Sequence, residues 1–145
     1  MRATIGRNWR FEMQGIPARR KGEPVLLLDP ETDRATKLAA QLELIGFPTR
    51  TENTGACALA AIKNEYFATL IVIADLDEKG CLDWLDDLRR AATRVWMIVI
   101  SSRCDTKSCN LIYRHGGDAC LTAPASIDDL TMRLTAFQLR ARPLY

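Results

Sequence analysis

The run Thr69-Leu70-Ile71-Val72-Ile73-Ala74, followed by Asp75, gives the clearest indication of the fold. It is apolar, rich in β-branched side chains and too short for a helix, which is typical of a strand buried on both faces of a parallel sheet. Similar short runs predict further strands at Val25–Leu28, Val95–Ile100 and Ala119–Thr122. A weaker strand is predicted at Phe47–Thr51, where Pro48 indicates an edge position.

Helical patterns alternate with these strands. Apolar positions recur at steps of three and four from Thr32 to Ile45, and Gly46 follows where a left-handed helix cap belongs. Ser126 and Asp129 form a start similar to a capping box. Comparable spacing predicts helices at residues 54–66, around 82–88, at 106–114 and at 126–140. The alternation predicts an α/β fold with a doubly wound, five-stranded parallel sheet in the flavodoxin-like order 2-1-3-4-5.

Composition agrees with one ordinary domain. Of the 145 residues, 48% are apolar and 26% charged, which excludes disordered and low-complexity classes. No apolar run approaches the roughly 18 residues of a membrane span, so no span is expected. Five cysteines are an odd number at irregular spacings, which argues against a secreted disulfide framework. We therefore expect a cytoplasmic protein.

Charge divides the chain into two parts. The net charge is +2, yet residues 1–24 hold six basic and two acidic side chains, which leaves residues 25–145 slightly acidic. We expect a flexible, basic amino-terminal arm at residues 1–24 and a folded domain at residues 25–145. The predicted last helix ends close to the end of the chain, so no separate output domain is expected. No nucleic-acid-binding motif is present, and a nucleic-acid partner is not expected.

The predicted topology brings candidate chemistry to one edge of the sheet. Asp29 follows the first strand, Asp75 follows the third and Ser101 follows the fourth. Ligands of such sheets bind outside the carboxyl ends of the strands, at the switch point between the first and the third. Two carboxylates beside a hydroxyl suit a hard cation and a phosphoryl group.

The chain here resembles the receiver domains of bacterial response regulators, the CheY-like superfamily, over about residues 25–140. The order and spacing of four segments carry the resemblance: residues 25–31, 70–76, 98–102 and 116–124. It implies that Asp75 is the phosphoacceptor of a phosphorelay and that Asp29 binds Mg²⁺ together with Asp75 and the backbone of Asp77. It also implies that Ser101, with Ser102 next to it, contacts the phosphoryl group.

Three departures from the family pattern make this an atypical, degenerate member. Pro30 stands where the family has a second acid, so only Glu31 could replace that metal ligand. Ala123 stands before Pro124 in place of the family's lysine, and Cys120 replaces the aromatic residue that reports activation. Because phosphoryl transfer depends on positioning and charge neutralisation, we expect weak Mg²⁺ binding and weak or absent phosphorylation.

The cysteines give a weaker indication. Cys104 and Cys109, with His115 nearby, could form part of a metal cluster, but the spacing matches no common zinc signature. Buried or incidental thiols are the favoured interpretation. His115 is the single histidine and no nucleophile elbow is present, so hydrolase chemistry is not expected.

We therefore expect a stand-alone, non-enzymatic receiver that acts in two-component signal transduction by protein contact. The resemblance implies an interface at about residues 106–140, for a histidine kinase, another signalling protein or a second copy of the chain. One alternative is a conventional phosphorelay receiver phosphorylated on Asp75. Another is a small flavodoxin-like enzyme or nucleotide binder, which predicts a ligand-sized pocket at the carboxyl ends of the strands.

Overall fold

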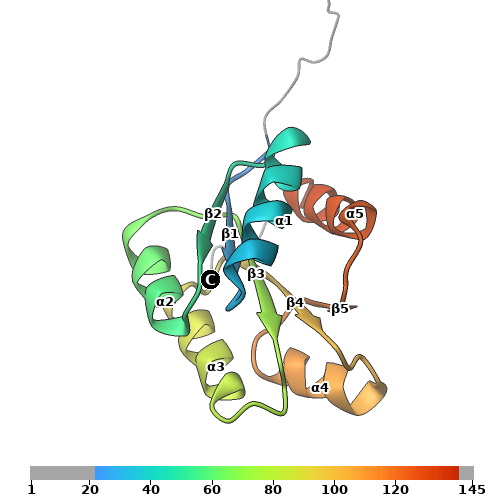
Figure 1. Cartoon of the computed structure of the whole chain (residues 1–145). Helices are drawn as coiled ribbons and strands as arrows, with labels where there is room; N and C mark the ends of the chain where they lie inside the picture. Colours follow the sequence, from blue (N-terminus) through green and yellow to red (C-terminus); the bar gives the residue numbers. More distant parts are fainter. Residues whose placement is uncertain (1–21, 141–145) are drawn as a thin grey trace, which may run out of the picture.

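The computed structural model describes residues 22–140 and contains a five-stranded parallel sheet in the order β2-β1-β3-β4-β5, as predicted (Figure 1). The strands are β1 Val25–Leu28, β2 Thr49–Glu52, β3 Thr69–Ala74, β4 Trp96–Ser101 and β5 Ala119–Thr122. The helices are α1 Thr32–Leu44, α2 Gly55–Asn64, α3 Cys81–Ala91, α4 Thr106–Arg114 and α5 Ile127–Gln138. Within residues 22–140, no helix has the length and apolar character needed to cross a membrane.

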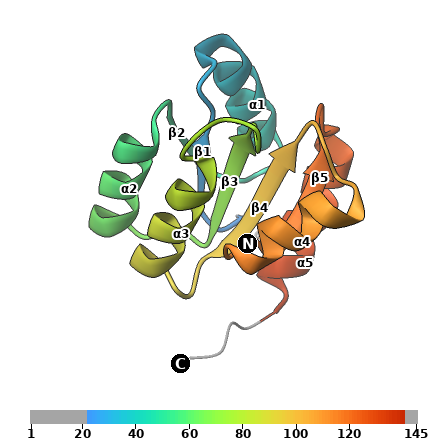
Figure 2. The same ribbon diagram turned by 90° about the horizontal axis from the view of Figure 1, so that it is seen from below.

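Helices cover both faces of the sheet. One core forms between the sheet and α2, α3 and α4, and the other between the sheet and α1 and α5. Successive strand residues point to opposite faces, so Leu26 enters the first core and Leu27 the second. Figure 2 shows β3 and β4 side by side at the centre of the sheet. Two buried faces explain why these strands are continuously apolar.

The bounds of two strands differ from the sequence prediction. The second strand runs over Thr49–Glu52 rather than Phe47–Thr51, because Phe47 leaves the sheet to enter the core. Pro48 precedes the strand, and its carbonyl accepts a hydrogen bond from the Val25 N–H. The fourth strand includes Ser101, which was expected just after it, because Ser101 pairs with Ala74 on one side and Thr122 on the other.

The described part of the predicted arm is attached to the domain. The Gly22 N–H donates to the carbonyl of Gly46 at 2.8 Å, and the Glu23 N–H donates to Gln138 Oε1 at 3.1 Å. These bonds tie the start of the described chain to the ends of α1 and α5. Residues 1–21 of the predicted arm lie outside the described residues.

Arg89, near the end of α3, connects three segments of the chain. Its guanidinium donates to the carbonyls of Ala92, Val95 and Gly116 and to the carboxylate of Asp118, at 2.6–3.1 Å. Gly116 adopts a left-handed φ of +106°, and a Cβ there would lie 2.8 Å from the Cβ of Arg89. A side chain at Gly116 would therefore be strained and would push Arg89 away from these carbonyls.

We predict that Arg89→Met lowers the free energy of unfolding by about 2–3 kcal/mol, because three carbonyls and the Asp118 carboxylate lose a charged donor. Urea unfolding measures this loss. Arg90→Met is the matched control: the Arg90 side chain is 73% exposed and, among residues 22–140, pairs with Asp87 on the surface, so its loss should stay within about 0.5 kcal/mol. Equal losses in the two variants would contradict the role given to Arg89.

Candidate functional site

The candidate residues lie at the carboxyl ends of the central strands. Leu28 is level with Val72 in the register of β1 and β3, so Asp29 and Asp75 follow neighbouring strands at the same edge of the sheet. Ser101, the last residue of β4, is level with Ala74, the residue before Asp75. The sheet order thus brings Asp29, Asp75 and Ser101 to one edge, which the sequence predicted.

Asp29 is fully buried, and both of its carboxylate oxygens are occupied. Arg34 donates from Nε to Oδ2 at 2.7 Å and from Nη2 to Oδ1 at 2.6 Å. The N–H of Glu31 donates to Oδ1 at 2.9 Å. A bidentate guanidinium–carboxylate pair is among the strongest polar contacts in proteins. The hydrogen bonds to Asp29 are also the main reason why the pKa of Arg34 is raised.

This arrangement does not fit a magnesium ion. Mg²⁺ requires oxygen ligands in near-octahedral geometry, and the Arg34 guanidinium covers the oxygens that Asp29 would supply. The Glu31 carboxylate is exposed and lies 3.4 Å from Arg34 Nη1. Pro30 has no carboxylate at all. Between residues 22 and 140, no three acidic side chains bring oxygens within 4.8 Å of one another.

Asp75 is exposed at the start of a tight turn. Its Oδ1 accepts the N–H of Asp77 at 3.0 Å, and its carbonyl accepts the N–H of Glu78 at 3.0 Å. The carboxylate of Asp77 in turn lies 3.3 Å from Nη2 of Arg103, on the loop after β4. The Asp75 carboxylate therefore caps the turn that leads into α3, and solvent reaches it.

Ser101, which provides the hydroxyl, ends β4, and Ala123 follows the neighbouring strand β5. Ser101 is buried, and its Oγ accepts the N–H of Arg103 at 3.2 Å, whereas Ser102 is exposed. The Ser101 carbonyl accepts the N–H of Ala123 at 2.8 Å, which fixes Ala123 beside the end of β4. The Ala123 methyl packs against the core shared with α1 and α5 and provides no charge.

Sequence reasoning missed Arg34, although a signal was present. Arg34 is the third residue of α1, where the positive end of the helix dipole disfavours a cation. A basic side chain at such a position indicates a nearby carboxylate partner. Asp29, which follows β1, is that partner.

The structure also gathers three cysteines whose spacing gave no recognisable motif. Cys104 lies before α4, Cys109 lies within α4 and Cys120 lies on β5, and their three Sγ atoms are all within 4.8 Å of one another. His115, which the sequence placed near this pair, instead contacts the Asp86 carboxylate through Nδ1 at 2.9 Å. The third sulfur belongs to Cys120, which lies 11 residues after Cys109 and on a different element. The cluster is therefore revealed by the fold and not by the spacing of the cysteines.

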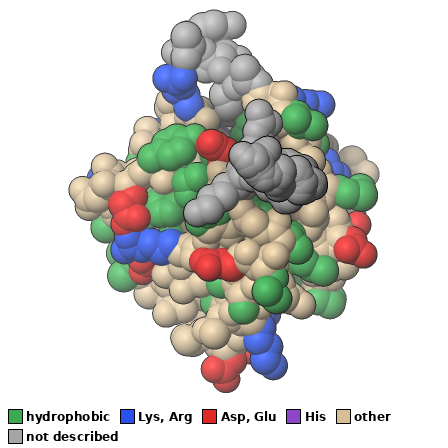
Figure 3. All heavy atoms as spheres, turned by 90° about the horizontal axis from the view of Figure 1, so that it is seen from above, with side chains coloured by type: hydrophobic (Ala, Val, Ile, Leu, Met, Phe, Trp, Pro, Cys, Tyr) green, Lys and Arg blue, Asp and Glu red, His purple; other side chains and the backbone are tan. Residues whose placement is uncertain are grey.

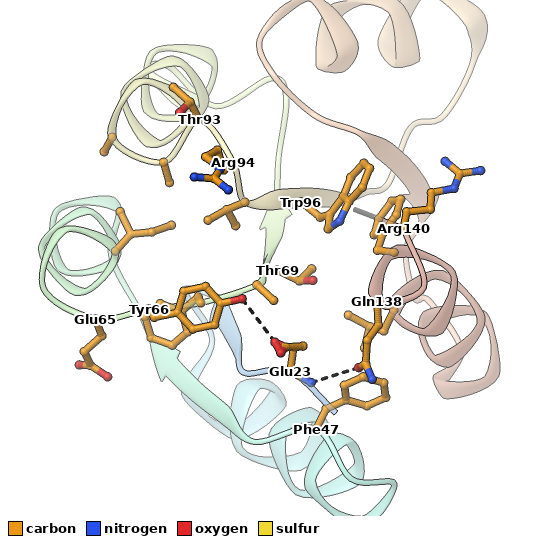
Figure 4. A pocket seen from close by; sticks show the side chains of 18 residues that line it. Glu23, Phe47, Glu65, Tyr66, Thr69, Thr93, Arg94, Trp96, Gln138 and Arg140 are labelled. Carbon is orange, nitrogen blue, oxygen red and sulfur yellow. Dashed lines mark hydrogen bonds between the residues drawn. The ribbon is translucent and has the colours of Figure 1, made fainter. Parts of the chain in front are cut away.

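A pocket of about 920 Å³ lies at the amino ends of β3 and β4, away from Asp75 (Figure 4). Tyr66 donates from its hydroxyl to Glu23 Oε2 at 3.3 Å, and Trp96 stacks on Phe137 with ring centroids 4.3 Å apart. Seen from this side, hydrophobic side chains are exposed among scattered charged ones (Figure 3).

A second pocket of about 520 Å³ lies at the carboxyl ends, between α1 and the segment 123–125. Arg34 and Lys37 line it together with apolar side chains from β3 and β4. This pocket is where a flavodoxin-like enzyme or nucleotide binder would hold its ligand. Its described lining contains no glycine-rich phosphate loop.

No family model matches the chain, and no curated protein matches its sequence. Solved receiver domains of response regulators share its fold. The Francisella response regulator 1452 receiver domain is 23% identical, with a TM-score of 0.72 over 80% of this chain and 96% of that chain. A Thermotoga maritima response regulator is 17% identical, with a TM-score of 0.71 over 82% and 99% of the two chains.

A third similar structure is a response regulator from Burkholderia pseudomallei with a phosphorylated aspartic acid and a calcium ion. It is 21% identical, with a TM-score of 0.67 over 77% of this chain and 66% of that chain. At these identities the likeness establishes the fold alone, and the strand order agrees with it.

We predict that Arg34→Met lowers the free energy of unfolding by about 1–3 kcal/mol, because it leaves the buried carboxylate of Asp29 without its cation. Chemical denaturation measures the change. Lys37→Met, an exposed position on the same helix, is the control and should change stability by less than about 0.5 kcal/mol. A loss no larger than that of the control would show that the pair contributes nothing to folding.

Proposed function

We propose that this chain is an atypical receiver domain that acts in signal transduction by contacting another protein, with weak or absent phosphorylation. The receiver fold supports the first part of the proposal. The second part rests on the bidentate pair between Arg34 and Asp29, in which a side chain of the protein holds the carboxylate that a metal ion would otherwise need.

The charges around Asp75 support this proposal. Phosphoryl transfer is catalysed almost entirely by positioning and by neutralising the charge on the phosphoryl oxygens. Here the guanidinium of Arg34 is committed to Asp29, and Ala123 offers no cation. Arg103 is paired with Asp77 on the exposed loop. A phosphodonor at Asp75 would therefore meet little preorganised positive charge, so we expect slow transfer.

The proposed partner surface comprises α4, β5 and α5. Tyr113 on α4 and Met132 on α5 expose 50% and 68% of their surface. Neither side chain is therefore buried in the core of the domain. Large exposed apolar side chains are common at protein interfaces. A histidine kinase, another signalling protein or a second copy of this chain is the proposed partner, in the cytoplasm and without an enzymatic role for this chain.

One observation favours a second candidate, a conventional phosphorelay receiver. The carboxylate of Asp75 is exposed, so a phosphodonor could reach it. The Burkholderia pseudomallei response regulator with this fold carries a phosphorylated aspartic acid and a calcium ion. For this chain to work in the same way, Glu31 would have to leave Arg34 and supply the missing metal ligand.

We predict no Asp75-dependent adduct when the purified protein is treated with Mg²⁺ and a small phosphodonor such as acetyl phosphate. Intact-mass measurement of the wild type and of Asp75→Asn detects the phosphoryl group. Equal, near-zero adducts in both proteins are expected. A robust adduct in the wild type that Asp75→Asn abolishes would overturn the proposal in favour of the conventional receiver.

Magnesium titration tests whether the Arg34 guanidinium keeps Mg²⁺ from the carboxylate of Asp29. Wild type should show no binding that depends on Asp29, and Arg34→Met should gain Mg²⁺ affinity because the carboxylate oxygens become free. The double variant Asp29→Asn, Arg34→Met should lose that gain. Asp29-dependent binding in the wild type would show that the guanidinium does not exclude the metal.

A further inference from the structure

The three sulfur atoms of Cys104, Cys109 and Cys120 form the one cluster among residues 22–140 in which three potential metal ligands lie within 4.8 Å of one another. The Sγ atoms of Cys104 and Cys120 are 2.8 Å apart. The Cys109 thiol contacts the carbonyl of Cys104 at 3.4 Å. All three side chains are half-buried, so an ion from solvent can reach them.

This spacing suits a metal ion with a preference for thiolates. Zinc–sulfur bonds of about 2.3 Å in a tetrahedral site place the sulfurs roughly 3.8 Å apart. The sulfurs of Cys104 and Cys120, 2.8 Å apart here, would therefore separate by about 1 Å on binding, and all three sulfurs already lie within 4.8 Å of one another. Thiolate ligands select soft or borderline ions, chiefly Cu⁺ and Zn²⁺, over Mg²⁺ or Ca²⁺. The cluster is thus chemically unlike the carboxylate edge at Asp29 and Asp75.

We propose that Cys104, Cys109 and Cys120 bind one thiophilic ion, Zn²⁺ or Cu⁺, through three thiolates. On binding, each Sγ–H bond breaks, a bond from sulfur to metal forms and the proton passes to solvent, with no change of oxidation state. His115 supplies no ligand, because its ring contacts Asp86. Three sulfurs complete a trigonal Cu⁺ site, whereas Zn²⁺ would add a water molecule as the fourth ligand.

Other contacts hold the elements that carry two of the cysteines. Cys120 packs against the core formed with α2, α3 and α4, which fixes the strand that carries it. Asp105 caps the first turn of α4 by accepting the Ser108 N–H, which holds the helix that carries Cys109. Both ligand-bearing elements are therefore set in place before an ion arrives.

The site joins the loop after β4, helix α4 and strand β5. Two of these elements, α4 and β5, also belong to the proposed partner surface. An ion would cross-link them independently of phosphorylation. This inference does not rest on the proposed function, since the cluster depends only on the fold.

The test uses the reduced protein, residues 1–145, under anaerobic conditions. Zn²⁺ is titrated in competition with a chromophoric chelator, and Cu⁺ in competition with bicinchoninate. The wild type should bind one equivalent of at least one ion. Removing an outer-shell partner of a metal ligand already costs about 10–100-fold in affinity, so Cys104→Ser, Cys109→Ser and Cys120→Ser should each lose at least about tenfold.

Cys57→Ser and Cys81→Ser are the matched controls, because these cysteines lie outside the cluster. Both should keep the wild-type affinity. A wild type that binds neither ion more tightly than the triple-serine variant would overturn the proposal. So would equal losses in the control and cluster variants, or wild-type protein that binds no ion but forms a Cys104–Cys120 disulfide in air.

X-ray absorption at the zinc or copper edge of the loaded wild type needs no variant, so it tests the proposal even if a serine variant fails to fold. Three sulfur ligands at about 2.3 Å are expected. A first shell of nitrogen and oxygen would overturn the proposal and indicate binding elsewhere. Comparing the two edges distinguishes the trigonal Cu⁺ site from Zn²⁺ with a fourth, lighter ligand.

Discussion

Asp29 and its ion pair with Arg34 organise the edge of the sheet where chemistry is expected. A buried carboxylate is costly unless it is paired and hydrogen-bonded. Asp29 meets this requirement with Arg34 and with the Glu31 N–H, which lies at the start of α1. Its backbone N–H donates to Glu52 at 3.0 Å, and its carbonyl accepts from the Asn53 side chain. The end of β1, the start of α1 and the end of β2 are therefore fixed by one residue.

Two of the three departures from the receiver pattern, at Pro30 and Ala123, share one physical effect, which is the loss of a charged side chain from this edge. Pro30 and Ala123 carry no charge, and the carboxylate of Asp75 is used in its own turn. A buried carboxylate held by a guanidinium in the same chain has a fixed partner. The proposed function, a receiver that acts by contacting another protein, follows from this arrangement of charges rather than from any one missing residue.

Much of the fold could be predicted because it depends on local pattern. Buried parallel strands produce continuous apolar runs, and the order of β3 and its neighbours follows from alternation with helices. Prediction was weakest at β2, an edge strand whose four residues are all polar or charged. It missed Arg34, although a cation in the first turn of α1 was a signal for its partner. It also missed the role of Cys120, because the partners of Cys120 are set by how segments pack and not by spacing. The roles of Asp75 and Ser101 stay predictions.

Because Arg34 belongs to the same chain as Asp29, the pairing of their charges does not depend on the concentration of any ion in solution. A metal ion occupies its site in proportion to its level in the surroundings, whereas a guanidinium five residues from its carboxylate is held at a constant, high effective concentration. Chelators, or a change in divalent cation supply, would leave the charge at the end of β1 unaltered. The charge balance at this strand edge is then set by the chain itself and does not vary with the supply of divalent cations.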